Sequence, residues 1–108
     1  MNWLDVCALE DIPQLGSRVI DSPLGDIALF RSADDGVFAL QDRCPHKGGP
    51  LSQGIVHGRQ VTCPLHNWQI QLESGEAVAP DVGCAHRYPT RVENGRVQLV
   101  LERIRKTA

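Results

Sequence analysis

The chain has 108 residues, a formal net charge of −2 and 42% hydrophobic residues. This length allows one domain with a modest core and excludes a separate catalytic domain. The small net charge gives no electrostatic reason to expect nucleic acid or an anionic membrane as a partner. No apolar run exceeds four residues, so we expect no membrane span. The first residues lack the basic and apolar segments of a signal peptide, and we expect a cytoplasmic protein.

Short segments with high β propensity, separated by Gly, Pro, Asp and Asn, run through the whole sequence. We expect strands over residues 3–8, 18–21, 26–31, 37–41, 60–62, 69–72, 76–78, 88–93 and 96–102. The best helical candidate, residues 9–14, is one short turn that Pro13 breaks. Many short strands with regular turn signals predict an antiparallel sandwich or small barrel.

Three dipeptides predict where the chain reverses. Asp35-Gly36 lies between two apolar segments and predicts a hairpin over 27–40, and Asn94-Gly95 predicts a second one over 89–101. Ser74-Gly75 indicates a third turn. Residues 103–108 are expected to form a frayed, partly basic tail.

Two short stretches, each with one cysteine and one histidine, carry the candidate chemistry. Cys44 and His46 are separated by one residue. Cys63 and His66 are separated by two, and 16 residues (47–62) lie between the pairs. Such close spacing lets one loop supply two ligands, so two loops can close over a metal centre from opposite sides. A mixed-ligand [2Fe–2S] centre requires this set, because two cysteines bind one iron and two histidines the other.

Other interpretations of the four residues remain open. Two cysteines and two histidines also suit tetrahedral zinc, although common zinc sites pair cysteine with cysteine and histidine with histidine. A fold that has lost its cluster and a chance spacing are further alternatives. We expect Cys7 and Cys84 to be thiols without a disulfide, by default small buried hydrophobes, and His57 and His86 to be structural.

Both ligand stretches and their surroundings resemble a known family. Residues 44–54 (CPHKGGPLSQG) and 63–68 (CPLHNW) closely resemble the ligand loops of Rieske [2Fe–2S] domains, and the resemblance extends over nearly the entire chain. Within that superfamily, the flanking KGGP (47–50) and NW (67–68) are most similar to the small subunits of NAD(P)H-dependent nitrite reductases.

The resemblance implies an all-β fold: a two-layer antiparallel β-sandwich or partial barrel with a small cluster-binding subdomain formed by two loops. It implies a single domain over residues 1–108, a subdomain over about 42–82, and Cys44, His46, Cys63 and His66 as cluster ligands. It implies no catalytic residue in this chain, which would carry electrons for an oxidoreductase.

The resemblance also implies a partner and a reaction. The partner would be a large nitrite reductase subunit that carries FAD, a [4Fe–4S] cluster and sirohaem, and that reduces nitrite to ammonium in nitrate assimilation. We keep two alternatives: a free-standing Rieske ferredoxin of a ring-hydroxylating dioxygenase system, and a non-redox assembly subunit. These would differ in their partner and in whether the chain binds iron.

Comparison with high-potential Rieske proteins predicts a low reduction potential. Those proteins link the two ligand loops by a disulfide at positions that correspond to Gly49 and Leu65. They also place hydroxyl donors where Trp68 and Ile70 stand here. Fewer hydrogen bonds to sulfur stabilise the reduced state less, so we expect a midpoint near or below about −100 mV. Trp68 itself would shield the cluster, contact a partner, or only pack in the core.

Overall fold

In the computed structural model, which describes residues 3–23, 25–45, 49–64 and 67–101, the chain forms three antiparallel sheets and two short 3-10 helices. The strands are β1 (Leu4–Ala8), β2 (Ser17–Ile20), β3 (Ile27–Arg31), β4 (Val37–Gln41), β5 (Ile55–His57), β6 (Gln60–Thr62), β7 (Gln69–Gln71), β8 (Arg87–Tyr88), β9 (Thr90–Glu93) and β10 (Arg96–Leu99). The helices are η1 (Leu9–Asp11) and η2 (Leu51–Gln53). The all-β antiparallel fold expected from the sequence is confirmed.

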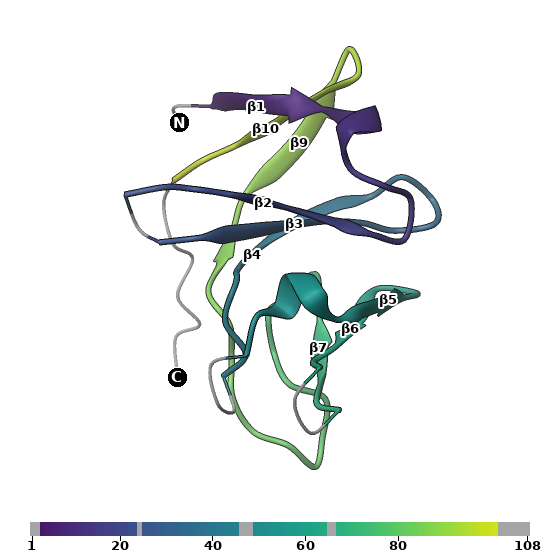
Figure 1. The fold of residues 1–108 in the computed structure, drawn as a ribbon, viewed down its shortest axis with the longest axis vertical. Coiled ribbons are helices and arrows are strands. Elements are labelled where there is room, and N and C mark those ends of the chain that lie inside the picture. Colours follow the sequence, from purple (N-terminus) through teal and green to yellow (C-terminus); the bar gives the residue numbers. More distant parts are fainter. Residues whose placement is uncertain (1–2, 24, 46–48, 65–66, 102–108) are drawn as a thin grey trace.

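The sheets lie in three layers along the long axis of the molecule (Figure 1). Sheet A has the order β1-β10-β9, sheet B the order β2-β3-β4-β8, and sheet C the order β5-β6-β7. Sheets A and B form the sandwich. Sheet C and η2 lie on the other side of sheet B, and Cys44 and Cys63 pack in the core at this end.

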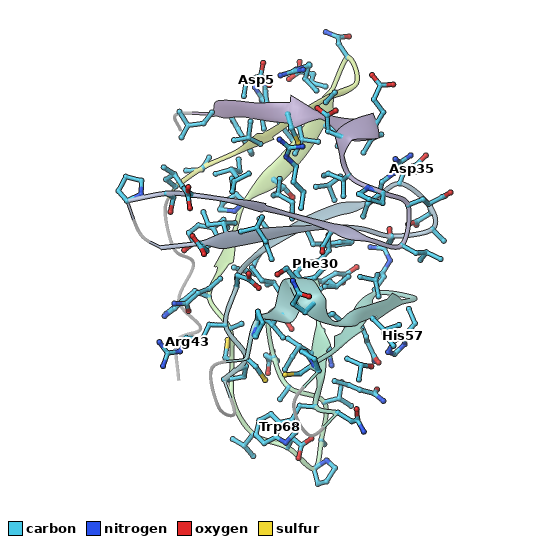
Figure 2. All side chains as sticks on the ribbon, in the orientation of Figure 1. Asp5, Phe30, Asp35, Arg43, His57 and Trp68 are labelled. Atoms are coloured by element: carbon cyan, nitrogen blue, oxygen red, sulfur yellow. The ribbon has the colours of Figure 1, made fainter. Side chains whose placement is uncertain are left out.

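Sheet B is the shared layer because its central strand β3 is buried on both faces. Neighbouring side chains on a strand point to opposite faces. Ile27 and Leu29 therefore enter a sandwich core against sheet A, while Ala28 and Phe30 enter a second core against sheet C. Figure 2 shows Phe30 between the sandwich and η2. The unbroken apolar run of β3 follows from this double burial.

Two cores result, and we name them by position. The sandwich core comprises Cys7, Ile12, Ile27, Leu29, Val37, Ala39, Tyr88, Val97 and Leu99. The site core comprises Ala28, Phe30, Leu40, Cys44, Leu51, Val56, Val61, Cys63, Ile70, Leu72 and Ala85. Both candidate cysteine ligands belong to the site core.

The two hairpins predicted from dipeptides are present. Asn94 and Gly95 both have positive φ (53° and 74°) between the paired residues Glu93 and Arg96, as a two-residue hairpin turn requires. Asp35 also has positive φ (64°), in the connection between β3 and β4.

The structure corrects several expected elements. The segment 88–93 is divided between β8 in sheet B and β9 in sheet A, because Pro89 offers no N–H to continue a ladder. Residues 76–78 form only isolated bridges, Ile70 with Ala77 and Glu76 with Cys84. Strand β5 was not expected, β10 ends at Leu99, and residues 9–14 contain only η1. The tail 103–108 lies outside the described residues.

Arg59, in the turn between β5 and β6, links sheet C to sheet B. Its guanidinium donates to Glu73 Oε1 at 2.6 Å and to Asp34 Oδ2 at 3.0 Å, and Asp34 lies in the β3–β4 connection. The same group lies 5.6 Å from the centroid of the Phe38 ring in β4. Charge pairing and a cation–π contact thus connect sheet C to sheet B.

Among the described residues, no helix is both long and apolar enough to cross a membrane.

Candidate metal centre

The first candidate ligand loop begins where the chain leaves sheet B after β4. Cys44 is 2% exposed and belongs to the site core. Its backbone N–H donates to Gly49 O at 2.7 Å, which closes a loop over residues 44–49. The chain then enters η2, where the fully buried Leu51 fixes it against the same core.

The second candidate loop connects two paired strands. Strands β6 and β7 pair antiparallel up to Thr62 and Gln69, and Cys63 follows directly after β6. Cys63 is fully buried, and its N–H donates to Trp68 O at 2.6 Å. Asn67 has a φ of 58°, which turns the chain back toward β7.

The two loops are closed in the same way. In each, the N–H of the cysteine donates to the carbonyl five residues later, and both cysteines are buried in one core. His46 and His66, the other two candidate ligands, lie inside these intervals of the sequence but outside the described residues. The structure therefore brings together the two cysteines predicted as ligands, and the four-residue assignment stays a prediction.

A third segment contacts both loops; the sequence analysis placed most of it in the cluster-binding subdomain but did not expect this contact. A Cβ built on Gly83 would lie 2.9 Å from Pro45 Cβ and 3.6 Å from Trp68 Cζ3, so the backbone of Gly83 lies against both loops. Its φ of +153° is rarely adopted by residues with a side chain. The Gly83 carbonyl accepts from Ala77 N–H at 2.9 Å. We call residues 76–84 the covering segment.

Trp68 lies half-buried against the site core and next to the covering segment. Figure 2 shows it at the end of the molecule farthest from β1. Of the three roles considered, core packing is thus established. Lys47 and Leu65, which belong to the two loop intervals of the sequence, lie outside the described residues.

The chemistry of the donor set fits a cluster. All four cysteines are described, and no disulfide joins them. Cys44 and Cys63 are each the first residue of a loop and are surrounded by apolar side chains. Such surroundings suit thiolate ligands, because they keep water away from the bound metal. Within the described residues no three possible metal-binding side chains gather, and both histidines fall outside them.

The remaining cysteines and histidines lie elsewhere. Cys7 is buried in the sandwich core, and burial raises the pKa of its thiol. Cys84 is exposed, which contradicts the default of a buried hydrophobe. Its thiol lies 3.4 Å from Ala85 O, in a hollow of about 400 Å³. His57 Nε2 lies 2.8 Å from Thr62 Oγ1, which agrees with a structural role.

Comparison with known proteins places the chain in a family. A family model described as "Rieske [2Fe-2S] domain" matches residues 2–89. The ferredoxin component of naphthalene 1,2-dioxygenase/salicylate 5-hydroxylase systems from Ralstonia sp. is 32% identical over 105 residues, covering 94% of this chain and 97% of that protein. The 3-phenylpropionate/cinnamic acid dioxygenase ferredoxin subunit of Photorhabdus laumondii is 35% identical over 104 residues, covering 94% and 96%.

Solved structures include the other branch considered. A structure from Mycobacterium tuberculosis, assigned as the small subunit of an NADH-dependent nitrite reductase, superposes with a TM-score of 0.80 at 28% identity. The match covers 91% of this chain and 93% of that one. Both branches are therefore represented among similar proteins, and the two relatives described above belong to dioxygenase systems.

Proposed function

The chain belongs to the Rieske [2Fe–2S] domain family, and on that premise we propose that it is the ferredoxin of a ring-hydroxylating dioxygenase system. The observation that supports this most is the similarity over almost the full length of both the chain and two dioxygenase ferredoxins. The expectation from flanking motifs favoured nitrite reductase; the comparisons favour the alternative kept beside it.

In this proposal Cys44 and Cys63 bind one iron and His46 and His66 the other, as the family's ligand set implies. The cluster would accept and release one electron at a time. Cys44 and Cys63 are buried in the site core with Trp68 packed against it, which supports the proposal because these side chains would restrict water around the two thiolates. Residues of about 42–82 form the proposed cluster-binding subdomain within a single domain.

The partners proposed are a flavin-containing reductase that supplies electrons and a terminal oxygenase that consumes them. The chain itself contains no proposed catalytic residue, so its specificity would lie in which proteins it exchanges electrons with. We assign no pocket of this chain to the substrate of the oxygenase.

A second candidate is the small subunit of NAD(P)H-dependent nitrite reductase, favoured by the 28% identical solved structure and by the KGGP and NW segments. Its partner would carry FAD, sirohaem and a [4Fe–4S] cluster. The two candidates share the ligand loops and differ only in the partner.

Two experiments test the proposal. Anaerobically purified protein should be reddish-brown, hold about two irons and two sulfides per chain, and give an EPR signal when reduced. His66→Ala should lose that signal, and the matched change His57→Ala should keep it. Colourless protein with stoichiometric zinc would contradict the cluster.

The second experiment identifies the partner by tagging the chain in its native host. Recovery of a flavin reductase and an oxygenase, with electron transfer from NAD(P)H through the chain to the oxygenase, is the expected result. Recovery of a large sirohaem subunit, together with nitrite turnover that depends on His66, would replace the proposal by the second candidate.

A further inference from the structure

The two ligand loops are held at their bases by different means. The second loop connects β6 to β7, so three pairs of residues in an antiparallel ladder hold its ends together. The first loop leaves from β4 and returns into η2, and these two elements are not paired strands. Its ends therefore need another connection beyond the single Cys44–Gly49 hydrogen bond.

One carboxylate makes that connection. Asp42, the first residue after β4, accepts the backbone N–H of Ser52 on Oδ1 at 2.7 Å. Its Oδ2 accepts the Ser52 hydroxyl at 2.8 Å. Both atoms of the carboxylate thus hold one residue of η2, ten positions along the chain. Hydrogen bonds to an ionised group are shorter and stronger than neutral ones, so this pair is a strong closure for its size.

We call the two Asp42–Ser52 hydrogen bonds the closure. Each of its two residues is also hydrogen-bonded to a residue of the sandwich. The Ser52 carbonyl accepts from Ser17 Oγ, at the start of β2, at 2.7 Å. The Asp42 N–H donates to Asp26 O, just before β3, at 3.0 Å. The base of the first loop is therefore tied to sheet B at two points, through residues that the ligand motif does not include.

We propose that Asp42 is the positioning residue of the first ligand loop: through Ser52 it fixes the distance between the two ends of the loop that carries Cys44 and His46. This inference rests on the proposed cluster. In such a centre the cysteine and the histidine of one loop bind different irons, so opening this loop would loosen both irons at once.

The closure can be dismantled in steps. Asp42→Ala removes both hydrogen bonds. Asp42→Asn can keep both, because the amide oxygen accepts the Ser52 N–H and the amide nitrogen donates to the hydroxyl oxygen. Ser52→Ala removes only the hydroxyl bond. Thr90→Ala is the matched control, since the Thr90 hydroxyl makes a part-buried bond of 2.7 Å to Val37 O, remote from the loop.

The test measures iron transfer from the loaded protein to a chelator, together with hydrogen exchange of the peptide that spans residues 43–51. We expect Asp42→Ala to release iron about tenfold faster or more, because it removes two hydrogen bonds to a charged group, and Ser52→Ala a few-fold faster, because it removes one of them. Asp42→Asn should fall between the unaltered protein and Asp42→Ala, because it keeps both hydrogen bonds but without the charge that strengthens them. Thr90→Ala should lower the urea midpoint without changing iron release.

Unchanged iron release and exchange in Asp42→Ala would overturn the inference, as would equal effects of Asp42→Ala and Asp42→Asn. If Asp42→Ala does not fold, Ser52→Ala against Thr90→Ala decides the matter by the same two measurements. An unaltered protein without iron would refute the proposed function instead. The exchange of residues 43–51 in Asp42→Asn and Ser52→Ala would then still support or refute the role in loop closure.

Discussion

Replacing Gly83 by alanine should loosen the covering segment from both ligand loops. The new methyl group would have to occupy a point 2.9 Å from Pro45 Cβ, and the proline ring cannot turn aside as a long side chain could. At the same time the residue would have to keep a φ of +153°, or the backbone would have to move. Either adjustment separates the segment from Pro45 and Trp68.

Two free-energy costs, backbone strain and steric overlap, add to give the expected loss of stability in Gly83→Ala. Holding a residue with a side chain in a sparsely populated backbone region costs about 1–3 kcal/mol. Forcing an extra methyl group into a packed contact costs about 1–3 kcal/mol more. We therefore expect Gly83→Ala to destabilise the folded protein by about 2–6 kcal/mol. Gly25→Ala is the control, because Gly25 has a φ of +104° and a methyl group added there would meet nothing within 4 Å.

The assay is urea denaturation of the anaerobic, cluster-loaded protein, followed by the loss of visible absorbance. Gly83→Ala should lower the midpoint further than Gly25→Ala by about 1 M, given a slope of about 1–3 kcal/mol per molar urea. Its cluster should also bleach faster in air. Equal midpoints and equal bleaching in the two variants would refute the claim that the covering segment protects the loops.

Three further predictions address charge and reactivity. Voltammetry should give a midpoint near or below about −100 mV, and a value above zero would contradict it. The hydrogen bond from Ser32, assisted by the charge of Arg59, lowers the pKa of the Asp34 carboxyl. Its contribution to stability is therefore present above the ordinary pKa of 3.8 and is lost as the pH falls through the lowered value. Asp34→Asn should make the free energy of unfolding, measured by urea denaturation, depend less on pH in this acidic range. Iodoacetamide at pH 8 should label exposed Cys84 well before Cys7, whose pKa burial raises, and mass spectrometry of peptides checks the order.

Most of the sandwich could be predicted because its signals are local. The Asp35-Gly36 and Asn94-Gly95 pairs carry the backbone angles of a reversal in their own residue types, and both hairpins formed as expected. Strand β5 was missed although Gly58, with a φ of 55°, marks the turn after it. Three residues are too few for a periodic pattern, so only pairing with β6 defines this strand.

The candidate site likewise has features that local sequence predicts and features that depend on the folded chain. The pairs Cys44/His46 and Cys63/His66 could be proposed as ligands from their spacing, since ligands on one loop are close in sequence, and the structure places the two cysteines in one core. The covering segment and the Asp42–Ser52 closure join residues through the folded chain, and no residue pattern marks them beforehand. The division of 88–93 between two sheets likewise depends on which strands are available as neighbours.

The position of sheet B in both cores and the ion pairs of Arg59 have a consequence for electron transfer between proteins. Across the described residues, sheet B contributes side chains to both cores. Arg59 forms ion pairs with Asp34, in the connection between β3 and β4, and with Glu73, which follows β7. We therefore expect sheet C and the sandwich to move as one body, because neither core can separate from sheet B without exposing apolar surface. In the proposed ferredoxin role, we expect the protein to exchange donor for acceptor by dissociating and rotating as a whole, so that encounter rates and ionic strength would limit its turnover.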